Sequence, residues 1–276
     1  MWRDFRSSST AMGGLAITLL VLAAVTVGAE LMSYSPTGMS FTTVLRPPSW
    51  AHLFGTDSYG RDVFTRVLYG ARVSLLISGC GVGLALMLGS LIGMTAAYFG
   101  RLYDLLVMRL MDLLFAFPAF VLALFLMVII GFGVVNVTIA IALVYVPIFA
   151  RLAHSMTLAV REEAYVQAAR AMGQPPLRLL AREILPNIAA PLMVQASIGV
   201  AFGVIIEAGL SFLGLGVQPP TPSLGTIMAD GQEYFRRAPW VLTMSGLAVC
   251  FALLGLNLLG DGLRDLVDPR LRKRAT

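Results

Sequence analysis

The chain has 276 residues, of which 58% are hydrophobic and 13% are charged, and its mean hydropathy is +0.82. Soluble domains carry nearer a quarter of charged residues, so this composition excludes an ordinary soluble protein and indicates an integral membrane protein. The net charge of +5 comes from residues between apolar runs, which membrane topology explains better than nucleic-acid binding does.

Six apolar runs are long enough to cross a bilayer as helices, because a hydrocarbon core of about 30 Å needs roughly 20 apolar residues. The sequence therefore predicts an all-α, polytopic integral membrane protein. The predicted spans are Ala11–Met32, Val73–Phe99, Leu105–Ile130, Val134–Leu152, Ala189–Leu213 and Val241–Leu259. The first run also resembles a signal peptide, but its apolar stretch is longer than a usual signal core and favours an uncleaved helix.

The distribution of Lys and Arg predicts the orientation of the spans. If the connections alternate between the two sides of the membrane, 14 of the 20 Lys and Arg residues share the side of the N-terminus. Because cytoplasmic loops are enriched in Lys and Arg, we expect both termini and the connection between the fourth and fifth spans to be cytoplasmic.

The external segment before the second span combines turn residues with charges. Asp62 and Arg66 are spaced i, i+4, which predicts an ion pair at the start of a helix. Asp57 and Arg61 fit two interpretations: a structural tie between subunits or a solvated turn, and a contact with a protein outside the membrane. In the second span, Gly79/Gly83 and Gly89/Gly93 have GxxxG spacing, which favours close helix packing.

Proline and charged residues interrupt the later spans. Pro118 and Pro147 predict kinks that neighbouring helices accommodate. Asp112 follows Arg109 by three residues near the end of its span, which favours a local ion pair or an interfacial position. Glu207 has no basic residue in its span, so it either lines a translocation pathway or pins a helix interface.

The connection between the fourth and fifth spans, residues 161–187, is a polar helical module. On a helical wheel, one stripe of about 160° consists of Ala164, Tyr165, Ala168, Ala169, Ala171 and Met172. The opposite face holds Glu162, Glu163, Gln167 and Arg170. Gly173 is placed for a left-handed cap, and Pro176 for the first residue of a second short helix that Pro186 ends. An alanine-rich stripe permits close approach by another surface; the alternative is a helix that lies on lipid headgroups.

Enzyme chemistry finds no support in the sequence. A phosphate-binding P-loop needs a GxxxxGK[ST] pattern, and the one lysine, Lys273, is followed by Arg274. The two histidines, His52 and His154, are predicted on opposite sides of the membrane, and a GxSxG nucleophile elbow is absent. A non-catalytic transport subunit therefore competes with an ion-coupled secondary carrier, which would need coupling residues within the membrane.

The module carries a family resemblance. Gln167-Ala168-Ala169, then Gly173, then Ile184-Leu185-Pro186-Asn187 resembles the EAA loop of binding-protein-dependent ABC transporter permeases. Two positions depart from the usual pattern: Gln167 replaces the name-giving Glu, and Glu183 stands where peptide permeases often have His.

Three further stretches resemble the dipeptide, oligopeptide and nickel branch of that family, and most closely its C-type subunit. They are HLFGTDSYGRDVFTRVLYGARVSL (His52–Leu75), GLSFLGLGVQPPTPSLG (Gly209–Gly225) and NLLGDGLRDLVDPR (Asn257–Arg270). In the second stretch, Leu224 replaces the Trp that is common in the branch. The resemblance covers most of the chain beyond residue 50.

The resemblance implies a type I ABC importer permease fold, with residues 1–70 forming a first helix and external loop, and residues 71–276 forming a five-helix core. It implies import of peptides, or alternatively of nickel chelates, opines or glutathione, across the bacterial cytoplasmic membrane. It also implies a heterodimer with a homologous permease, two cytoplasmic ATPase subunits that bind the ATP, and an external solute-binding protein, with Asp57 and Arg61 as candidate contacts. The chain itself needs no cofactor and contacts membrane lipid. The residues expected to couple to an ATPase are Glu163, Tyr165, Gln167, Ala168, Ala169, Arg170, Gly173, Arg178, Glu183, Leu185 and Pro186.

Overall fold

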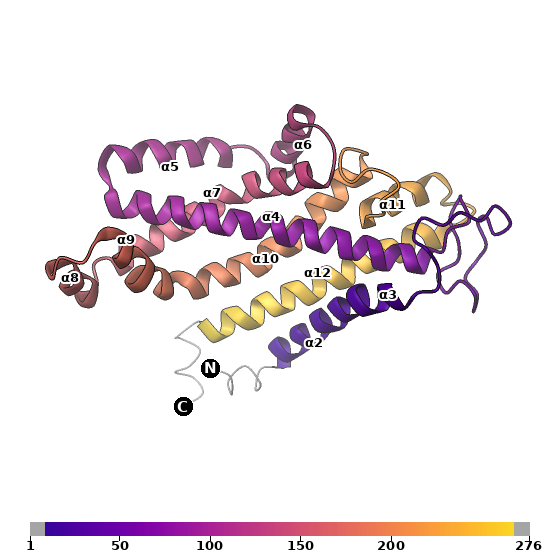
Figure 1. The fold of residues 1–276 in the computed structure, drawn as a ribbon, viewed down its shortest axis with the longest axis horizontal. Helices are drawn as coiled ribbons and strands as arrows, with labels where there is room; N and C mark the ends of the chain where they lie inside the picture. Colours follow the sequence, from indigo (N-terminus) through magenta and orange to yellow (C-terminus); the bar gives the residue numbers. More distant parts are fainter. Residues whose placement is uncertain (1–8, 268–276) are drawn as a thin grey trace.

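The computed structural model describes residues 9–267, and every regular element in this range is a helix apart from one isolated bridge between Thr56 and Asp62. Figure 1 shows an elongated bundle whose long helices run roughly along one axis. At one end of that axis stand α8 (Ala164–Ala171) and α9 (Pro176–Leu179), and at the other end stands the loop over residues 32–62. The prediction of an all-α protein is confirmed.

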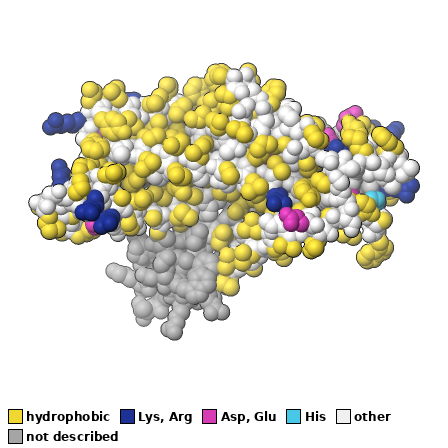
Figure 2. All heavy atoms as spheres, in the orientation of Figure 1, with side chains coloured by type: hydrophobic (Ala, Val, Ile, Leu, Met, Phe, Trp, Pro, Cys, Tyr) yellow, Lys and Arg dark blue, Asp and Glu magenta, His cyan; other side chains and the backbone are white. Residues whose placement is uncertain are grey.

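The remaining helices form the body of the bundle. They are α2 (Ser9–Ala23), η1 (Ala24–Gly28), α3 (Ala29–Leu31), α4 (Val63–Phe99), α5 (Arg101–Phe115), α6 (Ala119–Ile130), α7 (Val134–Val160), η2 (Leu180–Ile184), α10 (Leu185–Phe212), α11 (Leu224–Glu233) and α12 (Pro239–Val267). Five helical runs are long and apolar enough to cross a membrane, and a sixth crossing is formed if α5 and α6 count as one span. Hydrophobic side chains cover the middle of the face in Figure 2, and charged side chains gather mainly toward its two ends. This distribution is that of a membrane-spanning bundle.

The third predicted span is not continuous. The helices α5 and α6 meet at an angle of 94°, so the kink predicted at Pro118 is confirmed and is sharp enough to break the span into two helices. Pro118 occupies the N-cap of α6 with an extended ψ of 131°, and its ring bars the residue before it from continuing the α5 helix. Pro147, in contrast, lies inside α7 without ending it.

The fifth span begins earlier than expected, because Pro186 does not end the preceding helix. The residues from Pro176 to Phe212 form one helical run of 37 residues. The turn η2 has π geometry, and the Leu185 N–H donates to the Leu180 carbonyl. Such a wide turn accommodates a missing N–H, and the Asn187 side-chain amide donates to the Glu183 carbonyl at 2.6 Å. The expected helix start at Pro176 is confirmed.

The closest helix crossing joins α4 to α7 and depends on one of the two predicted glycine pairs. A Cβ added at Gly89 would lie 2.6 Å from the Val146 carbonyl oxygen, and one added at Gly93 would collide with the Ala150 carbonyl. The other pair, Gly79 and Gly83, has no atom of another residue within 4 Å of an added Cβ. Only Gly89/Gly93 therefore serves packing within this chain.

We predict that Gly93→Ala destabilises the protein, because the added methyl group must displace the α7 backbone. Overpacking of this kind costs about 1–3 kcal/mol and should lower the melting temperature of the detergent-solubilised chain. The matched control, Gly83→Ala, adds the same methyl group to open space in the same helix and should leave the melting temperature unchanged or raised. Equal melting temperatures for the two variants would show that the α4–α7 crossing is not tight.

Candidate functional site

The helix α8 has a face that packs on its own chain and a face that does not. Val166 is 2% exposed and Ala169 is 7% exposed, whereas Ala164, Ala168 and Met172 are exposed. The predicted alanine stripe is therefore largely free, but placing Ala169 in it was wrong, because that methyl group packs inward. An exposed, small-residue face at one end of the bundle is suited to contact with another protein.

The turn after α8 has the geometry of a Schellman motif. Gly173 has a φ of +80°, a left-handed conformation that glycine adopts without strain. The Gly173 N–H donates to the Arg170 carbonyl at 3.0 Å, and the Gln174 N–H donates to the Ala169 carbonyl at 3.2 Å. The prediction of a glycine cap is confirmed, and the cap fixes the direction in which the chain enters α9.

A polar cavity of about 540 Å³ lies between α8 and α9. Its wall includes the predicted residues Tyr165, Ala169, Gly173, Arg178 and Glu183. The pKa of the Tyr165 phenol is raised above its ordinary value of 10, by desolvation and then by the carboxylates of Glu163 and Glu183. The phenol is therefore protonated at neutral pH and available as a hydrogen-bond donor.

The other predicted module residues lie outside that cavity. Gln167 turns back toward its own chain, where its side-chain amide donates to the Arg161 carbonyl at 3.0 Å. Arg170 is exposed on the same side of α8, and Leu185 and Pro186 are exposed at the start of α10. The structure thus brings five of the residues predicted to contact an ATPase together around the α8–α9 turn. The remaining predicted residues lie elsewhere on α8, at its N-cap or at the start of α10.

Charged contacts fasten the module and α5 to the bundle. The Arg161 guanidinium donates to the Ala97 carbonyl at 2.5 Å, at the end of α4. Asp112 pairs with Arg151 of α7 at 2.6 Å, so the expected local pair with Arg109 was wrong. A pair of this kind between distant positions leaves no local spacing signal in the sequence.

A second site-like cluster lies at the opposite end of the molecule. The Asp57 carboxylate, 2% exposed, accepts from Arg61 Nε at 2.6 Å and lies 3.4 Å from Arg66 Nε. Asp230 of α11 pairs with Arg61 at 3.1 Å and with Arg66 at 3.4 Å. Two carboxylates and two guanidinium groups thus hold the external loop, α4 and α11 together. Asp57 and Arg61 are buried within this chain, so they form an internal tie rather than a solvated turn, and this burial disfavours direct contact with an outside protein.

The spacing predicted an ion pair between Asp62 and Arg66, and this prediction is wrong. Asp62 instead caps the N-terminus of α4. Its Oδ2 accepts from the Thr65 N–H and from the Thr65 hydroxyl, both at 2.8 Å, and its Oδ1 lies 2.9 Å from His52 Nδ1. An aspartate at an N-cap turns its side chain back over the first turn of the helix. That geometry leaves Arg66 free to contact Asp57.

Glu207 is completely buried in α10. The Ser211 hydroxyl donates to its Oε1 at 2.7 Å, and the hydroxyls of Ser74 on α4 and Ser223 before α11 lie beside the carboxyl group. Glu207 therefore sits at the junction of three elements within this chain, which favours the helix-pinning interpretation over a pathway lining.

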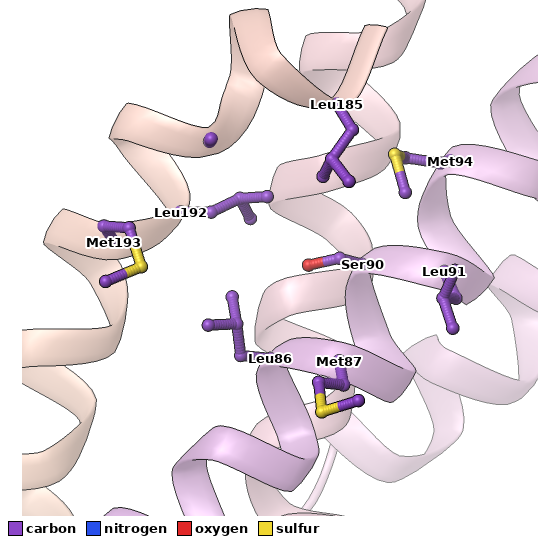
Figure 3. A pocket seen from close by; sticks show the side chains of 9 residues that line it. Leu86, Met87, Ser90, Leu91, Met94, Leu185, Leu192 and Met193 are labelled. Atoms are coloured by element: carbon purple, nitrogen blue, oxygen red, sulfur yellow. The ribbon is translucent and has the colours of Figure 1, made fainter. Parts of the chain in front are cut away.

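A second cavity, apolar and about 290 Å³ in volume, separates α4 from α10 next to the module. Figure 3 shows Leu86, Met87 and Ser90 of α4 on one side of it and Leu192 and Met193 of α10 on the other. Among the described residues, the Ser90 hydroxyl has no hydrogen-bond partner. An apolar hollow therefore lies beside α4 where α10 leaves the module, while Ile184, Ile188 and Leu192 are buried in the core at the same level.

Comparisons with known proteins agree with the fold and with the family resemblance. Residues 86–273 match the family described as binding-protein-dependent transport system inner membrane component. The chain is 40% identical to the dipeptide transport system permease protein DppC of Alkalihalophilus pseudofirmus, over 98% of this chain and 90% of that one. It is also 40% identical to the di/tripeptide transport system permease protein DppC of Pseudomonas aeruginosa, over 99% and 92%. The fold is similar to a chain of the MetNI methionine ABC transporter in an inward-facing conformation, with a TM-score of 0.59, 18% identity, and coverage of 73% of this chain and 96% of that chain.

We predict that Asp57→Asn strongly destabilises the protein, because Arg61 and Arg66 would keep their charges while losing the buried carboxylate between them. Removing one partner of a buried ion pair costs about 3–5 kcal/mol. Asp230→Asn is the matched control, because its side chain is 37% exposed and a partly solvated pair contributes about 1 kcal/mol or less. Thermal unfolding of the two variants measures the difference. Equal losses of stability would contradict the central place of Asp57 in the cluster.

Proposed function

The chain belongs to the family of binding-protein-dependent transport system inner membrane components, and we propose that it is the permease subunit of an ATP-driven importer of peptides. Two relatives named as dipeptide and di/tripeptide permeases are 40% identical to it over nearly its whole length. That agreement carries the choice of peptides over nickel chelates, opines or glutathione, which remain the alternatives for the same machinery.

The energy for transport comes from separate ATPase subunits. The sequence has no P-loop pattern, so the ATP binds to those separate chains, and this subunit acts as a membrane component. The docking surface for an ATPase is the exposed face of α8, with Ala168 at its centre and Tyr165 and Met172 at its sides. Small side chains there permit close approach, and the polar cavity between α8 and α9 offers Arg178 and Glu183 to a partner's polar groups.

Movement of the module reaches the membrane through α10. Because Pro176–Phe212 is one helical run, a force on α9 acts directly on the spanning helix. The apolar cavity between α4 and α10 leaves room for α10 to shift. Closure of the ATPase pair by ATP would thereby bias the permease between inward-open and outward-open states.

A second permease subunit covers the exposed side of α5 and α6. In α5 only Met111 is buried, and in α6 only Leu122, Ala123 and Met127 are buried. Both helices therefore expose most of their apolar side chains, and a homologous subunit in a heterodimer would cover them together with membrane lipid.

The external end faces the solute-binding protein in this assembly. The excess of Lys and Arg on one side of the membrane supports a cytoplasmic location for α8, α9 and both termini, and an external location for the Asp57–Arg61 cluster. Asp57 and Arg61 shape that external surface from within. Glu207 holds α10 against α4 and α11. An ion-coupled secondary carrier would need a group of coupling residues within the membrane, and a single buried carboxyl group with hydroxyl partners is poorly suited to that role.

We predict that Ala168→Glu abolishes co-purification of the ATPase subunits, because it places a charged side chain at the centre of the docking face without touching the chain's own core. The matched control is Ala51→Glu, which makes the same change at an exposed alanine of the external loop, at the opposite end of the molecule. Pull-down of the co-expressed complex measures both. Retention of the ATPase by Ala168→Glu would rule out docking through this face.

We predict ATP-dependent dipeptide uptake by proteoliposomes that contain the chain, its partner permease, both ATPases and the binding protein. Labelled dipeptide, glutathione and a nickel chelate, supplied separately at equal concentration, test the substrate class. Uptake of the dipeptide should exceed that of the other two solutes at least tenfold. Uptake of glutathione or the nickel chelate alone would replace peptides as the substrate while leaving the transport mechanism in place.

A further inference from the structure

A polar cavity of about 290 Å³ lies where the turn between α4 and α5 meets α8. Three arginines line it: Arg101 from the start of α5, Arg161 from the end of α7, and Arg170 from α8. Tyr98 of α4 contributes to the same wall. Side chains from four helices thus converge on one basic cavity, on the opposite side of α8 from its docking face.

The charges around this cavity are unbalanced. Arg161 is already engaged, because its Nε lies 3.0 Å from the Glu162 carboxylate and its Nη1 donates to the Ala97 carbonyl. Arg101 and Arg170 are exposed, and neither pairs with a carboxylate among residues 9–267. One carboxylate against three guanidinium groups leaves an excess of positive charge, which is suited to an anion.

The cavity lies at the level of lipid headgroups. At the external end of α4, Arg72 pairs with Glu30 at 3.4 Å, and the helix from Val73 to Phe99 contains no charged residue. That stretch rises about 40 Å at 1.5 Å per residue, which matches a bilayer of about 40–45 Å including its headgroups. The end of α4, and the cavity beside it, therefore reach the opposite headgroup layer.

Apolar side chains border the cavity on the membrane side. Phe99 is 56% exposed, Tyr103 is 44% exposed and Leu102 is 66% exposed. Phe99 and Tyr103 pack edge to face with ring centroids 6.4 Å apart. Aromatic side chains are enriched at membrane interfaces, and a ligand held here would have a charged group against arginines and an apolar part against these residues.

We propose that this cavity binds the phosphate group of an anionic phospholipid in the cytoplasmic leaflet. Guanidinium groups donate paired hydrogen bonds to phosphate oxygens, and basic pockets between spanning helices hold anionic headgroups. The adjacent Phe99 and Leu102 favour a lipid over free phosphate. The leaflet rests on the orientation in the proposed function. A bound lipid would join the α4–α5 turn to α8 and steady the module before an ATPase docks.

Native mass spectrometry of the full chain in neutral detergent tests the proposal. The chain is titrated with phosphatidylglycerol or with phosphatidylcholine of the same acyl chains, and separately with inorganic phosphate. Phosphatidylglycerol should bind at least tenfold more tightly than phosphatidylcholine. Arg101→Gln and Arg170→Gln should each weaken it about fivefold, from about 1 kcal/mol per basic residue near a membrane surface. Arg109→Gln removes the same charge from an exposed position on α5 outside the cavity and should change the affinity less than twofold.

Each contrary result identifies a different error. Equal binding of the two lipids, or an equal loss in Arg109→Gln, would overturn a specific site in favour of general attraction. Displacement of phosphatidylglycerol by an equimolar amount of inorganic phosphate would overturn the lipid as the ligand. Unchanged lipid binding together with loss of ATPase co-purification in Arg101→Gln and Arg170→Gln would assign the cavity to the ATPase. Ala168→Glu should leave lipid binding intact, so failure of the docking face and failure of this site are separately visible.

Discussion

The uninterrupted helix from Pro176 to Phe212 is the constraint on which this molecule's function depends. It joins a module outside the membrane to a spanning helix with no flexible linker between them. Pro186 lacks a backbone N–H, and the π turn at Leu180–Ile184 carries the helix past it without a break. A displacement of α9 therefore becomes a displacement of α10 rather than a bend between them.

The rest of the bundle supplies a frame against which α10 can move. The glycine contacts of Gly89 and Gly93 fix α4 to α7, and the buried cluster around Asp57 fixes the external end. At the module end, α10 borders an apolar cavity beside α4, while Glu207 holds its other end against α4 and α11. The helix is thus anchored by a polar contact far from the module and borders an apolar hollow near it.

Local patterns in the sequence predicted the features that depend on neighbouring residues. Apolar length predicted the spans, and the positions of Gly173 and Pro176 predicted a cap and a helix start, because capping is decided within a few residues. The GxxxG spacing predicted close packing at Gly89/Gly93 and equally at Gly79/Gly83. It could not distinguish the two pairs, because the assembled bundle decides which face of α4 meets α7. The family resemblance of the module and the later stretches added the type of fold and the class of transport, which agree with the comparisons.

Features that depend on distant residues were missed or misjudged. The partner of Asp112 is Arg151, 39 positions away, and no local pattern encodes that contact. A helical wheel placed Ala169 with the exposed alanines, because it cannot show which part of a stripe packs on the chain's own core.

The contact between α8 and an ATPase is the central claim, and cross-linking tests it most directly. With Cys80 and Cys250 replaced by Ser, Ala168→Cys labelled with a maleimide–benzophenone reagent should photo-cross-link to the ATPase subunit, whereas Ser35→Cys in the external loop, labelled in the same way, should not. Cross-linking from position 35, or none from position 168 in an ATP-hydrolysing complex, would contradict the account.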